Sequence, residues 1–380
     1  MPTTPSQQDS TTPAAAAPAP IRRHQTVRHL LSQRQLRDSV ALASPPSLRI
    51  ALIAAMQSAL AVLLALVMAR LSPWPELVGF PGLGALAALF GRFAPMHLRM
   101  RIVVACVGML ALAVLLPSLA SLAGAPQWAM LLLLALIAGA STLAVSHWVI
   151  GGPGAVIIVF AAGASMAPVH GVDVVVQRVL ATLAGGIAAL LVCWATDWLR
   201  KDALPKVKLP APVAPPFKSE LVAAARITVG AGMGAAIAYA AGWQHPSWAA
   251  IGTAAVMQGA HLHITMNRAL QRMAGTVVGS VLVGIILSQH PSFWWIAFFI
   301  VLFQFATEVI IGYNYALGQV TVTPMALLMT YLASPATASN LPVERVMDTI
   351  LGAALGIVFA VVFSSLDDRA HLHKLHKQQR

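Results

Sequence analysis

The sequence predicts an all-α, polytopic membrane protein of about 12 transmembrane helices in two parallel six-helix repeats. Three observations lead to this prediction. Hydrophobic residues make up 58% of the 380 residues and charged residues only 9%, whereas ordinary soluble domains carry about 25% charged residues. Many apolar runs approach about 20 residues, the length that crosses a bilayer core of about 30 Å. Finally, the two halves of the chain repeat each other.

The first segment, residues 1–47, is predicted to be a disordered and then basic amphipathic stretch on the cytoplasmic side. Residues 1–20 are rich in proline, alanine and threonine and contain no apolar core, which argues against a secretory signal peptide. Residues 21–42 interleave arginines with apolar side chains. This pattern is typical either of a segment lying on an anionic membrane surface or of a solvated basic tail.

Twelve apolar segments follow, with a basic, proline-rich linker at residues 200–219 between the sixth and the seventh. Those of the first repeat (48–199) run over residues 49–70, 77–92, 102–123, 127–149, 152–169 and 175–198. Those of the second repeat (220–366) run over residues 220–241, 246–263, 271–288, 291–312, 315–333 and 346–366. A linker of this composition is extended. Residues 367–380 form a basic tail.

The repeat is visible as ordered matches at two constant offsets. Offset 171 relates Pro75 to Pro246, Arg101 to Arg272 and Gly108 to Gly279. Offset 167 relates Pro168 to Pro335, Arg178 to Arg345, Thr182 to Thr349 and Gly185 to Gly352. We interpret the pattern as an internal duplication. Six spans per repeat is an even number, so both repeats start on the same side of the membrane.

Charge predicts the orientation. If the N-terminus is inside, 20 of the 24 lysines and arginines fall on the inner side, the exceptions being Arg70, Arg178, Arg226 and Arg345. By the positive-inside rule both termini are expected in the cytoplasm. The net charge of +12 is thereby explained as a topology signal. No nucleic-acid-binding motif accompanies it.

The stretch NRALQRMAGTVVG, residues 267–279, sets Arg268 and Arg272 before Gly275, Thr276 and Gly279 at the start of an apolar run. The arginines are explained as a topology anchor, and the glycines as a helix-packing face. Neither explanation requires an arginine four residues before a threonine. This spacing nevertheless recurs in Arg178 with Thr182 and in Arg345 with Thr349.

The block HPSWAAIGTAAVMQGAHLHITMNRALQRMAGTVVG, residues 245–279, resembles the signature of the fusaric acid resistance (FUSC) family. That family is similar to the aromatic acid exporters and, more distantly, to the aluminium-activated malate transporters. The resemblance rests on Trp248, which opens a short span, and on Arg272, Gly275, Thr276 and Gly279, which open the next. It extends over residues 48–366, but the first repeat has Val104 and Ala105 at the Gly and Thr positions.

The resemblance implies a multi-pass transporter of the bacterial inner (plasma) membrane that handles organic anions, often as an exporter of aromatic carboxylic acids. Larger members of the family carry cytoplasmic domains, and this chain has only the linker and short tails. The resemblance therefore does not imply regulation or partner docking through such domains for this chain. The expected partners are the lipid bilayer and a small organic anion. A periplasmic adaptor protein or a homo-oligomer stays open.

A carboxylate substrate needs fixed cations and hydrogen-bond donors within the bilayer, where ionisable side chains are candidates for function. Spans interrupted by Gly or Pro at matching places in two repeats point to a transporter site. We therefore expect a cavity between the eighth, ninth and eleventh spans, with Arg272 at its inner mouth and Arg226 about 9 Å inside the seventh span at the helical rise. The predicted substrate-binding residues are Arg226, Arg272, Thr276, Gln258, Gln319 and Thr323. The alternatives are an arginine that snorkels to the interface and hydroxyls that bond their own helix.

Glu308, near the cytoplasmic end of the tenth span, is a candidate for proton coupling or else an interfacial partner of a basic residue. The sequence shows no nucleophile–base arrangement, no phosphate-binding loop, no dinucleotide fingerprint and no metal-ligand spacing. No enzymatic activity, cofactor or metal is therefore expected. A passive anion channel and a non-transporting membrane subunit of an envelope complex are the alternative functions.

Overall fold

The computed structural model describes residues 47–200, 216–258, 262–333 and 340–363. Within these ranges all regular secondary structure is helical. The predicted all-α, polytopic class is therefore confirmed. The predicted N-terminal amphipathic segment, most of the linker and the C-terminal tail lie outside the described residues.

Each predicted apolar segment corresponds to a helix. The first half contains α3 (Leu48–Leu71), α4 (Gly79–Ala85), α5 (Met96–Leu122), α6 (Gln127–His147), α7 (Val156–Ala164) and α8 (Val172–Ala195). The second half contains α9 (Phe217–Ala240), α10 (Pro246–Met257), α11 (Leu262–Ser288), α12 (Phe293–Ile310), α13 (Tyr315–Ala333) and α14 (Leu341–Val362). Short 3-10 turns, η1 (Pro75–Leu77), η2 (Leu86–Leu89) and η3 (Asp197–Arg200), complete the described structure.

The helices are of two lengths. Of the helices in the described ranges, 9 are long and apolar enough to cross a membrane. The other three are α4, α7 and α10, with 7, 9 and 12 residues. At about 1.5 Å per residue none of these three spans a core of about 30 Å by itself. They are the second and fifth helices of the first half and the second helix of the second half, so two of the three occupy matching places.

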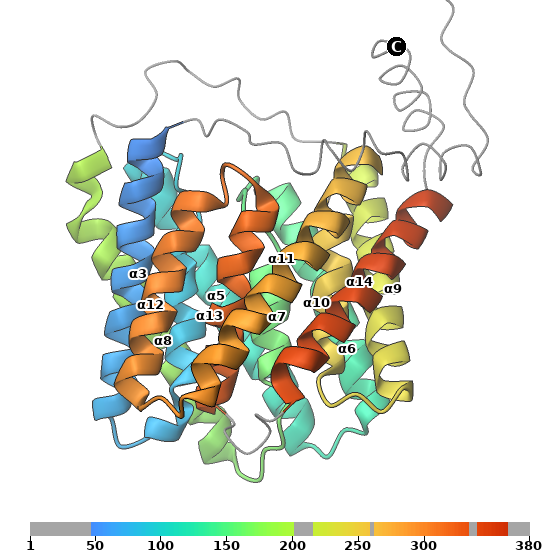
Figure 1. Ribbon diagram of the computed structural model, residues 1–380, viewed down its shortest axis with the longest axis horizontal. Helices are drawn as coiled ribbons and strands as arrows, with labels where there is room; N and C mark the ends of the chain where they lie inside the picture. The colour runs from blue at the N-terminus through green and yellow to red at the C-terminus, as the bar shows by residue number, and fades with distance from the viewer. Residues whose placement is uncertain (1–46, 201–215, 259–261, 334–339, 364–380) are drawn as a thin grey trace, which may run out of the picture.

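The same helix pairs are in contact in both halves. In the first half α4 and α5 both pack on α8, and in the second half α10 and α11 both pack on α14. Across the halves, α3 packs on α12 and α9 packs on α6. The first helix of each half thus lies against the fourth helix of the other. This reciprocal packing supports the proposed duplication. In Figure 1, α3 begins and α14 ends at the same, upper end of the bundle.

Glycines set the close contacts of the second half. A Cβ placed on Gly234 would lie 3.2 Å from the carbonyl oxygen of Ala249 in α10, and one on Gly352 would lie 2.6 Å from the same oxygen. Helix α10 is therefore held between α9 and α14 by backbone-to-backbone contact. This is how membrane helices associate when small residues line the interface. The explanation of the glycines as a packing face is confirmed here.

Several boundaries differ from the sequence prediction. Arg200, assigned to the linker, belongs to η3 and is buried, and helix α9 already begins at Phe217. Helix α11 begins at Leu262, whereas the apolar run suggested 271. Hydropathy detects only the apolar part of a helix. Because polar residues lie between 262 and 271, the start of the helix was predicted too late in the sequence.

Candidate functional site

A cavity of about 1090 Å³ lies between the two halves of the chain, and both halves contribute to its wall. The predicted α10, α11 and α13 contribute to its wall, and so do α6, α7, α9, α12, α14 and the loop 151–154. Binding sites for small molecules commonly measure about 300–1,000 Å³, so the cavity has room for a small organic molecule. Its charged lining residues are Arg92, Arg226, Arg268, Arg272, Arg345, Glu220 and Glu308.

The cavity opens at one end of the bundle and is closed at the other. Its exposed lining residues, among them Gly151, Gly152 and Ser219, lie where α6 ends and α9 begins. That is the end at which α3 begins and α14 ends (Figure 1). Ile251 and Arg345, from the first turns of α10 and α14, line the cavity at the opposite end and are buried.

Arg272 is the central cation of the wall. Its Nη1 donates to the Tyr315 hydroxyl at 3.3 Å and to Oε1 of Gln319 at 3.4 Å. These contacts join α11 to α13. The residue is 2% exposed and lies ten positions after the first residue of α11, so it is placed deeper in the helix than the inner mouth predicted for it. Arg268, one turn earlier, is half-buried and lies 5.8 Å above the Tyr315 ring.

Arg226 and Gln258 lie on other parts of the same wall. The side chain of Gln258 contacts the loop that joins α6 to α7. A Cβ on Gly154, which has a φ of +81°, would lie 3.0 Å from Oε1 of Gln258. Glycine is required there by both the left-handed backbone and the close contact. Of the predicted binding residues, Arg226, Gln258, Arg272 and Gln319 are thus brought together.

Thr276 and Thr323 are not among the cavity-lining residues. Both are buried, 1% and 0% exposed, at or near the interface between α11 and α13, where a Cβ on Gly279 would lie 2.8 Å from the Cβ of Thr323. Their hydroxyls make no hydrogen bond with the described residues. The predicted roles in the binding site therefore lose their geometric support. The sequence alone could not distinguish a threonine that lines a cavity from one at a helix interface, because small polar residues occur at both.

Glu308 pairs with Arg92 across the two halves. Arg92 Nη1 lies 3.3 Å from Glu308 Oε2, and both residues line the cavity. The alternative considered for Glu308, an ionic partner on a basic residue, is therefore observed. A second buried carboxylate, Glu220, accepts a hydrogen bond from Ser146 at 3.2 Å and lies 3.3 Å from Nδ1 of His147.

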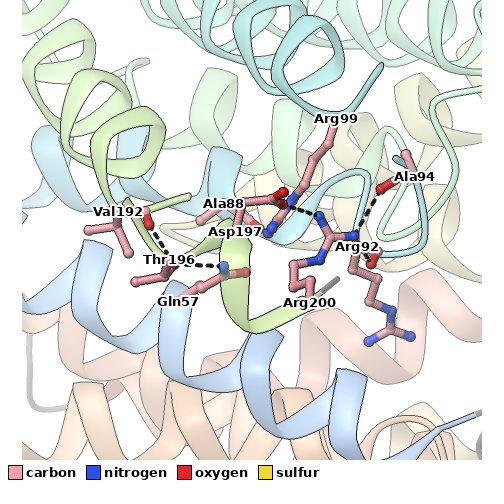
Figure 2. Close-up of polar contacts among 9 residues, drawn as sticks. All are labelled: Gln57, Ala88, Arg92, Ala94, Arg99, Val192, Thr196, Asp197 and Arg200. Atoms are coloured by element: carbon pink, nitrogen blue, oxygen red, sulfur yellow. Dashed lines mark hydrogen bonds and ion pairs between the residues drawn. The ribbon is translucent and has the colours of Figure 1, made fainter. Parts of the chain in front are cut away.

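The backbone that carries Arg92 is fixed by a buried arginine, as Figure 2 shows. Arg200 donates from Nη2 to the carbonyl oxygens of Arg92 at 2.5 Å and Ala94 at 2.9 Å, and from Nη1 to Asp197 at 2.9 Å. The guanidinium of Arg92 points away from this cluster. The contacts thus hold the loop that presents Arg92 to Glu308.

The closed end is built from a stack of side chains on α10 and α14. Trp248 lies between two partners, with the His245 ring stacked at 4.3 Å and the Arg345 guanidinium 5.1 Å from its ring centre. His245 Nδ1 lies 2.6 Å from Glu344. Trp248 is 5% exposed, so it lies inside the bundle and does not belong to an aromatic belt at the membrane interface. Trp294 and Trp295, exposed on α12, fit such a belt.

Sequence reasoning missed three features of this cavity. Arg345 was counted only among the four cations outside the inner side, Arg92 was counted as a topology charge, and Tyr315 was not considered. The recurring arginine-to-threonine spacing was a signal for Arg345. For Arg92 the sequence offers no such signal, because its pairing with Glu308 joins positions that are 216 residues apart.

Comparison with known proteins supports the resemblance in the second half. A family model for fusaric acid resistance protein-like sequences matches residues 233–359. An uncharacterized membrane protein of Bacillus subtilis (strain 168), YvaC, is 37% identical over 122 residues, which cover 32% of this chain. The matched part is 19% of that relative, so this chain aligns with about a fifth of its length. No solved structure matches.

Proposed function

We propose that this chain, whose residues 233–359 match the fusaric acid resistance protein-like family model, is a secondary transporter of the bacterial inner membrane. It exports organic anions, with aromatic carboxylates as the preferred class. The observation that carries the proposal is the cavity, which five arginines and two glutamates line. Fixed cations in a low-dielectric wall concentrate anions and speed their entry.

The rest of the wall suits an apolar substrate body. Phe160, Ile251, Met325 and Tyr315 contribute apolar or aromatic surface. An aromatic carboxylate combines such a body with one anionic group. Arg226 and Arg272 would bind the carboxylate, and Gln258 and Gln319 would add hydrogen bonds. Export is the proposed direction because the open end of the cavity coincides with the starts of α3 and α9, the side predicted to be cytoplasmic.

Flux in proteoliposomes tests this function. We expect the purified protein to transport radiolabelled benzoate, to accelerate it when a pH gradient is imposed, and to leave chloride almost untransported. Glu308→Gln should remove the acceleration and keep downhill flux, because its side chain cannot exchange a proton. Flux that ignores the gradient and passes chloride equally well would identify a passive channel. Absence of flux for every anion tested would favour a non-transporting subunit.

The orientation has its own test. In a background without Cys106 and Cys193, single cysteines at Gln244 and Ser292 should react in intact cells with a membrane-impermeant thiol reagent, once the outer membrane is permeabilised. Cysteines at His97 and Lys218, at the other end of the bundle, should react only after the inner membrane is opened. All four positions are exposed in the structure. Labelling of Lys218→Cys in closed cells would reverse the proposed topology and the direction of transport.

A further inference from the structure

Arg345 lies at the closed end of the cavity, and two of its side-chain nitrogens make no hydrogen bond with the described residues. The residue is 3% exposed and lines the cavity. Its Nε and Nη1 make no hydrogen bond with the described residues. A buried cation is costly to hold unless other groups neutralise it or accept its hydrogen bonds. Trp248 lies against the guanidinium, with its ring centre 5.1 Å from Cζ of Arg345.

The first half offers a matched comparison. Arg178 is equivalent to Arg345 and lies 5.3 Å from the Phe80 ring centre, as Arg345 lies above Trp248. Arg178, however, donates to the carbonyl oxygens of Ser165, Ala167 and Pro168. It does not line the cavity. Among the described residues, Arg178 is therefore hydrogen-bonded to backbone carbonyls, whereas Nε and Nη1 of Arg345, a residue of the cavity wall, are not.

Asp348 interacts with Arg345 electrostatically but does not form a hydrogen bond with it. Asp348, one turn further along α14, is 0% exposed, and neither of its carboxylate oxygens accepts a hydrogen bond from the described residues. No ion pair between the two is found among the described residues. The other charged group in electrostatic range of Arg345 on the cavity wall is Arg272. Two cations in one buried cavity favour an anion that both can contact.

We propose that Arg345 is a second, deeper anion-binding residue, which holds the carboxylate at the closed end of the cavity after Arg272 has bound it near the middle. The inference rests on the proposed transport of organic anions and adds a specific position to it. The ligand group is a carboxylate or a similar oxyanion, because these match the planar fork of donors on a guanidinium. Arg178, in contrast, is a structural residue that holds the end of α7.

Thiol accessibility tests the position without relying on transport. Arg345→Cys and Arg178→Cys would be made without Cys106 and Cys193 and placed in nanodiscs, where both membrane faces are accessible. We expect Arg345→Cys to react with the anionic reagent MTSES at least about tenfold faster than with the cationic MTSET, because the remaining cations focus anions. Arg178→Cys should react with neither. Equal inertness of the two variants would refute the deep site, even if the parent transports benzoate.

Binding provides the second readout. Radiolabelled benzoate binding to the parent, Arg345→Lys and Arg178→Lys in nanodiscs would be compared per folded protein. We expect Arg345→Lys to weaken benzoate binding by about tenfold to a hundredfold, and Arg178→Lys to leave it nearly unchanged. A mixed outcome is that MTSES labels Arg345→Cys while the parent neither binds nor transports benzoate. That outcome would support an anion site at Arg345 and refute aromatic carboxylates as the substrate class. Unaltered benzoate binding in Arg345→Lys would overturn the inference.

Discussion

Arg272→Lys is expected to insert into the membrane normally. Its rate of benzoate efflux should fall by about tenfold to a hundredfold, the effect expected when one hydrogen bond to a charged group is lost. The guanidinium of Arg272 is buried and already uses Nη1 for Tyr315 and Gln319. Its remaining donors lie in one plane and can grip two carboxylate oxygens, whereas lysine is a point charge on a flexible stem. The measurement is efflux normalised to protein in the membrane.

Arg268→Lys is the matched control. Arg268 lies on the same helix and on the same cavity wall, but it is half-buried and lies over the Tyr315 ring. Lysine preserves both a positive charge and a cation–π contact. We therefore expect efflux within about twofold of the parent, the range of a substitution away from critical features. If Arg272→Lys transports as well as Arg268→Lys, both arginines are topology anchors and the binding site lies elsewhere.

Gly279→Leu is expected to have the largest effect on folding. A Cβ at Gly279 would lie 2.8 Å from the Cβ of Thr323 and 3.0 Å from both Cδ of Pro324 and the carbonyl oxygen of Val320. Pro324 cannot donate to that carbonyl, which lies four residues earlier in α13. The wall formed by α11 and α13 thus depends on backbone approach at this point. Overpacking costs about 1–3 kcal/mol for added methylenes, and a leucine here must also displace α13.

Gly284→Leu separates this packing effect from the general cost of changing a glycine in α11. A Cβ at Gly284 meets nothing within 4 Å. We expect Gly284→Leu to elute as a single species and to melt close to the parent. Gly279→Leu should aggregate or melt at a much lower temperature in the same detergent. Equal melting temperatures for the two variants would show that α11 and α13 do not pack as described.

Much of the fold followed from hydropathy and repetition. The twelve segments were predictable because each is apolar, and the short α10 was visible from the nearness of the next polar stretch. The depth of Arg272 was not predictable, because the first turns of α11 carry Asn267, Arg268 and Gln271 and therefore look like a loop. Glycine and proline content marked the second, fifth, eighth and eleventh segments as interrupted. The first three of these are short helices, whereas the eleventh, α13, is a helix of 19 residues that contains Pro324.

The candidate site was predictable only in part. The sequence identified Arg226, Gln258, Arg272 and Gln319 because polar side chains within apolar helices are energetically costly and are therefore candidates for function. Arg345 was not assigned to the site because a charge-counting rule uses position along the chain and not the side chain's surroundings. Three-dimensional packing decides which end of the cavity closes, and no local pattern in the sequence encodes it.

The reciprocal contact of α3 with α12 and of α9 with α6 has the form of an isologous interface, in which one patch meets its own copy about a two-fold axis. In a dimer of separate identical subunits, every substitution occurs twice, so a cavity in one subunit always has a counterpart. Fusion of the two copies into one chain removes that constraint. One half can then keep its arginine tied to backbone carbonyls while the other commits the equivalent arginine to a ligand. Arg178 and Arg345 can therefore have different roles in a single chain with two repeats, whereas in a dimer of identical subunits the two arginines would be the same residue.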